Sequence, residues 1–542
     1  MTNSERLGVV TDGAFSAFLT VRLDPGCSSE QIRIGDFVIV EGEEYLYFSL
    51  ISDIQLRATD KRLLADPPRD ASPFIRRALA GTSTYATVQV KPMLAIDKPK
   101  EGEMVDILAK PEPVRTIPMH LATLRQATHG DFRIVFGEED KTHFAMGTPL
   151  TMDIPICLNM PRLMERSNGV FGQSGTGKSF LARLLLCGII DRNVGVNLIF
   201  DMHDEYAFGR QSEDGQWVKG LRHLFGPQVL IYSLDERAAS RQGRNVDVVL
   251  RIGLNQIEPG DVLLLGDELD LTPASRATVG LLRDSYGKNW LQRLLAMSSE
   301  DIALFCQERM AHQGATEALQ RKLRDVGRRP YVVEEAPFNA IDEMVAALDK
   351  GKHIILHFGR HDRALDHMLV ANIVTRRVRQ LYQEKVARYE QTQKPADRPR
   401  TLMITLEEAH KFLNPAVSRQ TIFGQIAREM RKYHVTLMVI DQRPSGIDPE
   451  VMSQLGTRVT GKLTEERDID AVLTGVANRA AMRGMLETLD TRQQILIMGH
   501  AVPMPIVLRT RPYDAEFYRS LGKGQQERLT AKEAADELFG DW

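Results

Sequence analysis

The residues from Gly172 to Ser179 carry the clearest chemical signal in this chain of 542 residues. Their sequence, GQSGTGKS, matches G-x-x-x-x-G-K-[ST] in full, between a predicted strand, NGVF, and a predicted helix beginning SFLARLLL. In this arrangement glycines let backbone N–H groups converge on phosphate oxygens, and the helix start adds the positive end of its dipole. Lys178 would bridge the β and γ phosphates, and the Ser179 hydroxyl would face Mg²⁺. The alternative is a chance glycine-rich turn. The predicted ATP-binding residues are Gly172, Gln173, Ser174, Gly175, Thr176, Gly177, Lys178, Ser179 and Phe180.

Two adjacent acidic residues follow a second apolar run, in TLMITLEEAH. Hydrolysis at a phosphate cradle needs a carboxylate that holds the Mg²⁺ shell and a group that orients the attacking water. We expect Glu407 to hold the metal through water, and Glu408 to orient and help deprotonate the nucleophile. The alternative is a pair of solvated acids at the start of a helix.

Polar residues also end two other predicted strands. Gln442 follows VTLMVID, and the carboxyl edge of an open α/β sheet is where ligands bind. It is therefore a candidate sensor of the γ-phosphate, or alternatively only a cap of the next turn. Asp201 follows VNLIF and is a candidate to support Mg²⁺ from behind its direct ligands. His203 is assigned no catalytic role.

Short, nearly all-apolar runs recur from residue 168 onward and alternate with helical segments such as FLARLLLCGIIDR. Runs of this kind are typical of parallel strands buried on both faces, so we predict a doubly wound α/β core at 151–512. Long polar helical segments interrupt it at 213–346 and predict a helical insertion. The predicted strands are NGVF, VNLIFD, VLIYSL, HIILHFG, TLMITLEE, VTLMVIDQ and QQILIMG.

The N-terminal part of the chain has a different pattern. Between Leu7 and Leu94 the short runs FSAFLTVRL, DFVIVEG, EYLYFSLISDI and YATVQVKPML are separated by Gly, Pro and Asp. This spacing predicts a small antiparallel β-barrel within 1–150, with the apolar pieces DFRIVFG and PICLNM leading into the core. The segment 513–542 is expected to be a charged helical tail.

Composition limits the class of protein. The chain has 69 Lys and Arg against 72 Asp and Glu, so the net charge of the molecule gives no indication that it binds nucleic acid. Its four cysteines form no CxxC pair, which argues against a disulfide framework and a zinc site. No apolar run approaches the ~20 residues of a membrane helix, and no secretory signal is visible. We expect a cytoplasmic protein without membrane contact.

The motifs GQSGTGKS, FDMHDEY, LEEAHKFL, REMRKYHVTLMVIDQRPSGIDPEVMSQ and GHAVPMPI occur in this order. Together they resemble the motif series of the HerA translocases, within the HerA and FtsK group of P-loop NTPases. The resemblance implies a RecA-like core and an N-terminal barrel of the kind that precedes the motor in that family, the HAS-barrel. It also implies a homohexameric ring that hydrolyses ATP at subunit interfaces and moves along double-stranded DNA. A nuclease commonly docks on the barrel side in this family.

The same resemblance implies roles for three arginines. Arg166 matches the interface arginine that reaches the γ-phosphate of a neighbouring subunit, while Arg428 and Arg431 fall in a second arginine motif. Each is alternatively a surface or salt-bridging residue. Two positions depart from the family pattern: Glu407 replaces the usual Asp, and Ser167 replaces a His. A longer carboxylate can still reach a metal-bound water, so activity is expected.

Contact with DNA is expected to be independent of sequence, since no motif that reads base edges is visible. Two basic clusters are candidates to neutralise phosphates, or are alternatively solvated helix faces. They comprise Arg321, Lys322, Arg324, Arg328 and Arg329, and Arg376, Arg377 and Arg379.

Several functions are compatible with these motifs. The first is an ATP-driven translocase that works with a nuclease in DNA end processing. The second is an assembly ATPase that scaffolds a nuclease or an NAD-consuming enzyme in antiviral defence. A motor for conjugative transfer is disfavoured because such motors are generally tied to a membrane. A nucleotide-binding module without hydrolysis is disfavoured because Lys178 and Glu408 are both present.

Overall fold

The computed structural model divides into two compact units, residues 1–159 with 477–511, and residues 160–476 with 512–542. Among the described helices, none is both long enough and apolar enough to cross a bilayer. The described residues are 6–15, 17–59, 79, 83–98, 111–211, 215, 217–235, 246–336, 339–416, 418, 421–476, 479–490 and 493–522.

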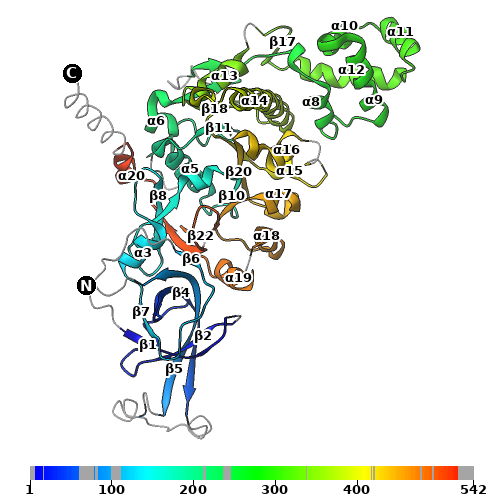
Figure 1. Cartoon of the computed structure of the whole chain (residues 1–542). Coiled ribbons are helices and arrows are strands. Elements are labelled where there is room, and N and C mark those ends of the chain that lie inside the picture. The colour runs from blue at the N-terminus through cyan, green and yellow to red at the C-terminus, as the bar shows by residue number, and fades with distance from the viewer. Residues whose placement is uncertain are drawn as a thin grey trace, which may run out of the picture. The chain divides into compact units, whose positions relative to one another are not determined.

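A six-stranded antiparallel barrel forms most of the first unit (Figure 1). The strands follow the order β2-β1-β7-β3-β4-β5, and pairing of β2 with β5 closes the barrel. Alternate side chains such as Val21, Val40 and Val88 are fully buried inside, as expected for a closed sheet with one packed face. The predicted barrel is confirmed. Its strands are β1 (Arg6–Gly13), β2 (Leu19–Leu23), β3 (Phe37–Glu41), β4 (Tyr45–Ala58), β5 (Thr84–Asp97) and β7 (Thr123–Gln126), with β6 (Glu112–Pro113) beside β5.

The remainder of this unit contains one of the apolar runs that were predicted for the core. QQILIMG, expected as a parallel strand, is β22 (Gln494–Gly499) and pairs antiparallel with β23 (Ile506–Thr510). The connection between them is too short for the crossover that a parallel pair needs. DFRIVF forms a helix, α3, capped by Thr128. The other elements are α3 (His129–Phe136), β8 (His143–Pro149), β9 (Ile156–Asn159) and α19 (Arg479–Glu487).

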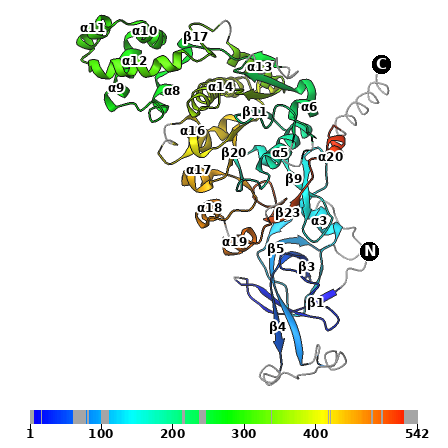
Figure 2. The ribbon, with the colours of Figure 1, turned by 180° about the vertical axis from the view of Figure 1, so that it is seen from behind.

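The second unit contains a parallel sheet with the order β15-β14-β18-β11-β19-β20-β10-β21 among its described residues. Helices α5 and α6 lie on one side of the sheet, and α14, α16 and α17 lie on the other (Figures 1 and 2). This is the doubly wound α/β core that the apolar runs predicted. The strands are β10 (Asn168–Phe171), β11 (Val196–Asp201), β14 (Val229–Ser233), β15 (Val248–Val249), β18 (His353–His357), β19 (Leu402–Glu407), β20 (Val435–Asp441) and β21 (Thr457–Thr460).

Helices and short strands complete this layer. The flanking helices are α5 (Lys178–Arg192), α6 (Leu221–Phe225), α13 (Ala340–Asp349), α14 (Ala364–Thr392), α16 (Ile422–Glu429) and α17 (Pro449–Gln454). Shorter elements are α4 (Met160–Met164), β12 (Arg210–Gln211), β13 (Trp217–Val218), α15 (His410–Leu413), the 3-10 turn η5 (Met430–Tyr433), α18 (Glu466–Val472) and α20 (Ala515–Ser520). Only α20 represents the expected helical tail, since 523–542 lie outside the described residues.

The helical insertion is smaller than the predicted range 213–346. It is a lobe of five helices, α8 to α12, that form a group of their own at one end of the second unit (Figure 1). The range also contained β14, α6 and α13, which belong to the sheet layer because β14 pairs with β18 and α13 packs on α14. The lobe is bounded by β16 (Ile252–Gly253) and β17 (Val332–Val333), which pair in parallel. Its helices are α8 (Pro259–Leu264), α9 (Pro273–Tyr286), α10 (Trp290–Ala296), α11 (Ser299–Arg309) and α12 (Gln313–Gly327).

The division into units also differs from the predicted boundary between residues 150 and 151. Contacts place the boundary after Asn159 and assign 477–511 to the N-terminal unit rather than to the core. The physical reason is the antiparallel pairing of β23 with β8 and of β8 with β9, which ties a late part of the chain to an early one.

Candidate active site

The loop between β10 and α5 has the backbone that a phosphate cradle needs. Gly172, Gly175 and Gly177 have positive φ angles of 152°, 79° and 85°, which other residues rarely adopt. A Cβ at Gly172 would lie 2.5 Å from the Thr176 Oγ1 atom, whereas a Cβ at Gly175 or Gly177 would meet no atom within 4 Å. The loop is therefore closed on one side by Thr176 and open where phosphates would lie.

Lys178 begins α5 and turns back across this loop. Its Nζ atom donates a hydrogen bond to the carbonyl oxygen of Gln173 at 2.9 Å. Burial lowers the pKa of Lys178, although the charges of Glu408 and Asp441 act to raise it. The lysine therefore lies among the carboxylates that end β19 and β20. Phosphate oxygens, which are stronger acceptors than a carbonyl, would replace Gln173 as its partner.

Glu407 ends β19 with its carboxylate almost fully buried, at 6% exposure. The Tyr206 hydroxyl donates to Oε1 at 2.9 Å, while Oε2 has no hydrogen-bond partner among the described residues. Burial raises the pKa of Glu407 well above its usual range, and the charges of Glu205 and Asp201 add to this. A buried carboxylate oxygen without a partner fits a hydrated cation, which would favour the ionised form. Glu407, with Ser179 at the start of α5, can therefore hold Mg²⁺.

Glu408 lies directly after the strand, at a left-handed backbone conformation with φ of 48°. Such conformations cost energy for a residue with a side chain and are concentrated at functional sites. The Nε2 atom of Gln442 donates to the Glu408 Oε1 atom at 3.4 Å. Parallel pairing of β19 with β20 brings the two residues together, because Glu407 is in register with Ile440. The sequence predicted both residues for the site, and the fold places them side by side.

Asp201 has a clear structural task in this fold. Its buried carboxylate accepts hydrogen bonds from the backbone N–H groups of Glu205, Tyr206 and Ala207, at 2.7, 3.0 and 2.9 Å. These bonds shape the turn after β11 and so place the Tyr206 hydroxyl against Glu407. Support of Mg²⁺ by Asp201 stays a prediction.

The three predicted arginines differ in their surroundings. Arg166 and Arg431 are exposed, and neither side chain has a hydrogen-bond or ion-pair partner given by the described residues. Arg428 instead donates to the Ser418 carbonyl at 3.2 Å and lies 3.8 Å from a Glu450 carboxylate oxygen. Two of the three side chains thus have no partner among the described residues.

Ser167, the position at which a His was expected from the family pattern, is buried. Its Oγ atom accepts a hydrogen bond from the backbone N–H of Leu437 at 3.1 Å. The short side chain therefore joins the chain just before β10 to β20, the strand that carries Gln442 at its end.

Sequence reasoning missed three residues of this site. Tyr206 and His410 lie inside motifs that were noted but were given no role, and Asp441 precedes the predicted sensor. The His410 ring is held by Asp441, because its Nδ1 atom lies 2.9 Å from a carboxylate oxygen of that residue. The only sequence signal for His410 and Asp441 was their position near Glu408 and Gln442, and that for Tyr206 was its position shortly after Asp201.

One of the two predicted DNA-binding clusters is not free for phosphates. Arg376 binds the buried Asp261 at 2.8 Å, and Arg377 makes two hydrogen bonds of 2.8 Å with Asp342. Arg379 is hydrogen-bonded to Gln425. These arginines join α14 to its neighbours, so the expectation of a phosphate-binding face on α14 is corrected. An arginine-rich helix pattern does not distinguish solvated residues from paired ones.

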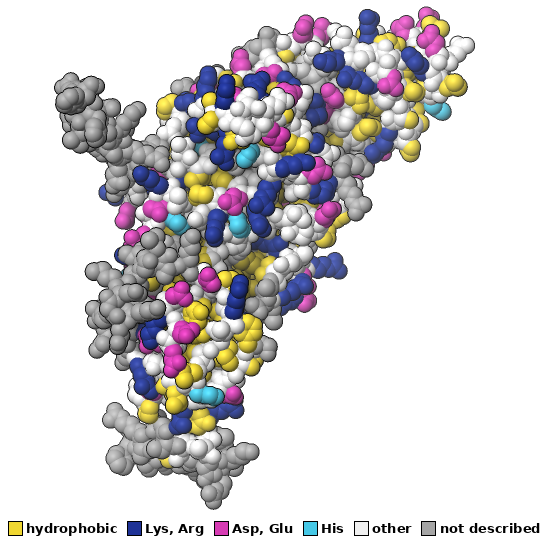
Figure 3. Space-filling model, viewed as in Figure 1, with side chains coloured by type: hydrophobic (Ala, Val, Ile, Leu, Met, Phe, Trp, Pro, Cys, Tyr) yellow, Lys and Arg dark blue, Asp and Glu magenta, His cyan; other side chains and the backbone are white. Residues whose placement is uncertain are grey.

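The cluster in the lobe is only partly engaged. Lys322 lies 3.5 Å from a carboxylate oxygen of Asp270, and Arg329 lies 2.8 Å from one of Asp325. Arg321 and Arg328 are exposed. Basic and acidic side chains alternate over the visible face of the molecule (Figure 3), so no large field of one sign marks a nucleic-acid surface there.

Comparison with known proteins shows which family this chain resembles. A family model described as "Helicase HerA, central domain" matches residues 144–378. The chain is 24% identical over 398 residues to the DNA double-strand break repair helicase HerA of Pyrococcus furiosus, covering 69% of this chain and 70% of the relative. It is 22% identical over 535 residues to that of Sulfolobus acidocaldarius, covering 97% and 98%. These matches support membership of this chain in the HerA family. The phosphate cradle and the paired glutamates are those of an ATPase.

Solved structures with a similar chain path include VirB4 of Thermoanaerobacter pseudethanolicus, with a TM-score of 0.45 and 13% identity over 70% of this chain and 100% of that one. Another is the bacterial conjugative coupling protein TrwB, with a TM-score of 0.46 and 12% identity over 71% and 92%.

Proposed function

We propose that this HerA-family ATPase assembles into a ring, most simply a hexamer, that moves along double-stranded DNA during DNA end processing. The observation that carries the proposal is the match to a relative named as a DNA repair helicase over 97% of this chain and 98% of the relative. The match extends through the barrel unit, the core and the lobe, so the sequence similarity is not confined to the phosphate cradle.

The site supports hydrolysis in a defined way. The loop amides and Lys178 hold the triphosphate, while Glu408, flanked by Gln442, orients the attacking water and accepts its proton. Mg²⁺, when bound, neutralises charge on the β and γ phosphates. Within its own subunit the site shows no arginine against Glu408 among the described contacts. An exposed arginine, Arg166 or Arg431, would enter from the neighbouring subunit, an effect worth ~10³ to 10⁵ in rate for arginines acting in trans.

Contact with DNA would use the exposed arginines of the lobe. Arg321 and Arg328 remain available on α12 and at its C-terminal end, after the ion pairs of Lys322 and Arg329 are taken into account. Contacts of this type neutralise phosphates without reading bases, so binding would be independent of sequence and would weaken steeply with salt.

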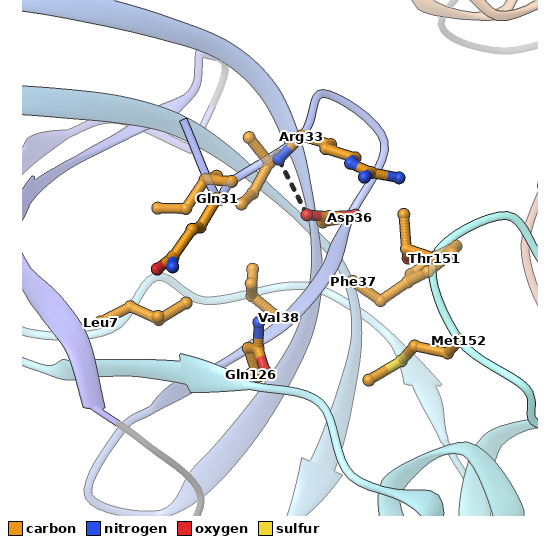
Figure 4. Close-up of a pocket in the computed structure, with 11 residues that line it drawn as sticks. Leu7, Gln31, Arg33, Asp36, Phe37, Val38, Gln126, Thr151 and Met152 are labelled. Atoms are coloured by element: carbon orange, nitrogen blue, oxygen red, sulfur yellow. Dashed lines mark hydrogen bonds between the residues drawn. The ribbon is translucent and has the colours of Figure 1, made fainter. Parts of the chain in front are cut away.

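A partner protein, such as a nuclease, would dock on the barrel unit. Large apolar side chains are exposed there, among them Ile34 at 66% and Leu121 at 71%, and a partner would cover them from water. The unit also has a pocket of about 240 Å³ lined by Ile32, Phe37 and Met152 (Figure 4). Activation of an effector in antiviral defence is the competing proposal for this surface.

The first experiment measures steady-state ATPase activity with and without linear duplex DNA. Assembly size is confirmed beforehand by light scattering. We expect a ring whose activity rises with DNA and is lost in Glu408→Gln, since the amide cannot accept a proton from water. Glu308→Gln, an exposed residue of α11, is the matched control and should behave as wild type.

The outcomes separate the proposals. Activity that ignores DNA and responds only to a co-encoded protein would reject translocation as the main function and favour the effector scaffold. Full activity in Glu408→Gln would reject the assignment of this residue.

A further inference from the structure

A buried carboxylate connects the two loops that carry Glu408 and Gln442. Asp441, the last residue of β20, is 1% exposed. Its Oδ2 atom accepts from the backbone N–H of His410 at 2.7 Å and lies 2.9 Å from His410 Nδ1. Its Oδ1 atom accepts from the backbone N–H of Arg443 at 2.8 Å. One side chain therefore fixes both the loop after β19 and the loop after β20.

This contact determines which side of the imidazole ring faces the active site. A carboxylate can only accept at Nδ1, so Nδ1 carries a proton and Nε2 is directed elsewhere. Nε2 lies 3.8 Å from the Oε2 atom of Glu408. The other oxygen of Glu408, Oε1, receives the hydrogen bond from Gln442. Both oxygens of the catalytic carboxylate are thus bordered by residues that the end of β20 positions.

Glu408 needs such support because of its own backbone. Its left-handed conformation persists only where the surroundings hold it, and its side chain is part of no regular element. Hydrogen bonding to Asp441 raises the pKa of His410, and the charge of Glu408 acts in the same direction. The raised pKa favours the protonated form of the ring, in which Nε2 carries a hydrogen toward the Oε2 atom of Glu408.

We propose that His410, held by Asp441, is a positioning residue that fixes the carboxylate of Glu408 in the orientation needed to activate water. The inference rests on the assignment of Glu408 as the residue that orients the nucleophile. It assigns an action to Asp441, at the end of β20, and to His410, at the start of α15.

The competing explanation is purely structural. Asp441 accepts the backbone N–H of His410, the first residue of the short helix α15, and so stabilises the start of that helix. In that case the imidazole ring itself would be dispensable for chemistry. The two explanations differ in whether loss of the ring changes the rate of hydrolysis through Glu408.

The test compares His410→Ala and Asp441→Asn, each in the wild-type and in the Glu408→Gln background. In the wild-type background we expect kcat to fall about 10- to 100-fold, as for residues that orient a reacting group, with the KM for ATP changed less than about twofold. The double variant His410→Ala with Asp441→Asn should lose no more than one single variant, because the two residues act as one unit. In the Glu408→Gln background, followed in single turnovers with excess enzyme, neither change should reduce the rate further.

A retained kcat in His410→Ala would overturn the proposal, and so would an equal fractional loss in both backgrounds. Full activity in Glu408→Gln itself would overturn the premise, and that failure is visible before any His410 variant is made. His410→Gln, whose amide can still donate toward Glu408, should recover part of the lost kcat, and it replaces His410→Ala in the same comparison if the alanine variant does not fold. His129→Ala, an exposed residue of the barrel unit, is the control.

Discussion

The residue pair Tyr206 and Glu407 illustrates how one departure from the family pattern is accommodated. The longer carboxylate reaches a tyrosine hydroxyl that the turn after β11 holds in place. We predict that Glu407→Asp withdraws the acceptor from that buried hydroxyl and lowers the free energy of unfolding by ~1–3 kcal/mol, the usual cost of a buried polar group without a partner. Chemical denaturation measures this loss.

The matched variant removes the hydroxyl as well. Tyr206→Phe combined with Glu407→Asp should be less destabilised than Glu407→Asp alone, because no buried donor is then left without an acceptor. Losses that simply add in the double variant would contradict this explanation of the contact.

Contacts between helices hold the lobe to the core, and the ion pair of Arg376 is the clearest case. Its guanidinium on α14 binds Asp261, a fully buried residue of α8. We predict that Arg376→Ala leaves an uncompensated buried charge and destabilises the attachment of the lobe by about 3 kcal/mol. Limited proteolysis and thermal melting detect the change. Affinity for duplex DNA should stay as in wild type.

For Arg321→Ala we expect the opposite result, a loss of DNA affinity without a loss of stability. This exposed residue of α12 has no structural role in the described contacts, so its loss should leave the melting temperature unchanged and reduce DNA affinity and its salt dependence. A DNA-binding defect in Arg376→Ala without loss of stability would restore α14 as a candidate DNA surface.

The same elements show what the sequence predicts and what it cannot. Apolar runs and the glycine-rich motif predicted β10, β11, β19 and β20 because these signals are local. The antiparallel pairing of β22 with β23 was not predicted, because an apolar run carries no information on parallel or antiparallel pairing. The contact of Asp441 with His410 joins residues 31 positions apart and follows only from the register of β19 with β20. The ion pair of Arg377 with Asp342 was not predicted for the same reason, since the two residues are far apart in the sequence.

At the scale of the whole molecule, the surroundings of Arg166 bear on the assembly. Its exposure, and the lack of a partner among the described residues of its own subunit, is expected of a residue that acts across an interface. We predict that Arg166→Ala and Glu408→Gln are each inactive alone but regain ATPase activity when mixed and reassembled. Some interfaces in mixed rings combine an intact Glu408 with an intact arginine from the neighbour.

The amount of recovered activity should vary with the mixing ratio and reach a maximum near equal amounts. A mixture that stays inactive at every ratio, although subunits exchange, would mean that Arg166 works within its own subunit or is not needed.

The pairing of β16 with β17 has a consequence for how this protein can vary. The chain enters the helical lobe through Ile252 and Gly253 and leaves it through Val332 and Val333, which lie directly beside one another. Because the two ends are already adjacent, closing them with a short connection costs little entropy, and exchanging the lobe leaves the sheet path unchanged. The lobe is in this sense a replaceable segment, whose exchange would leave the hydrolytic core unchanged.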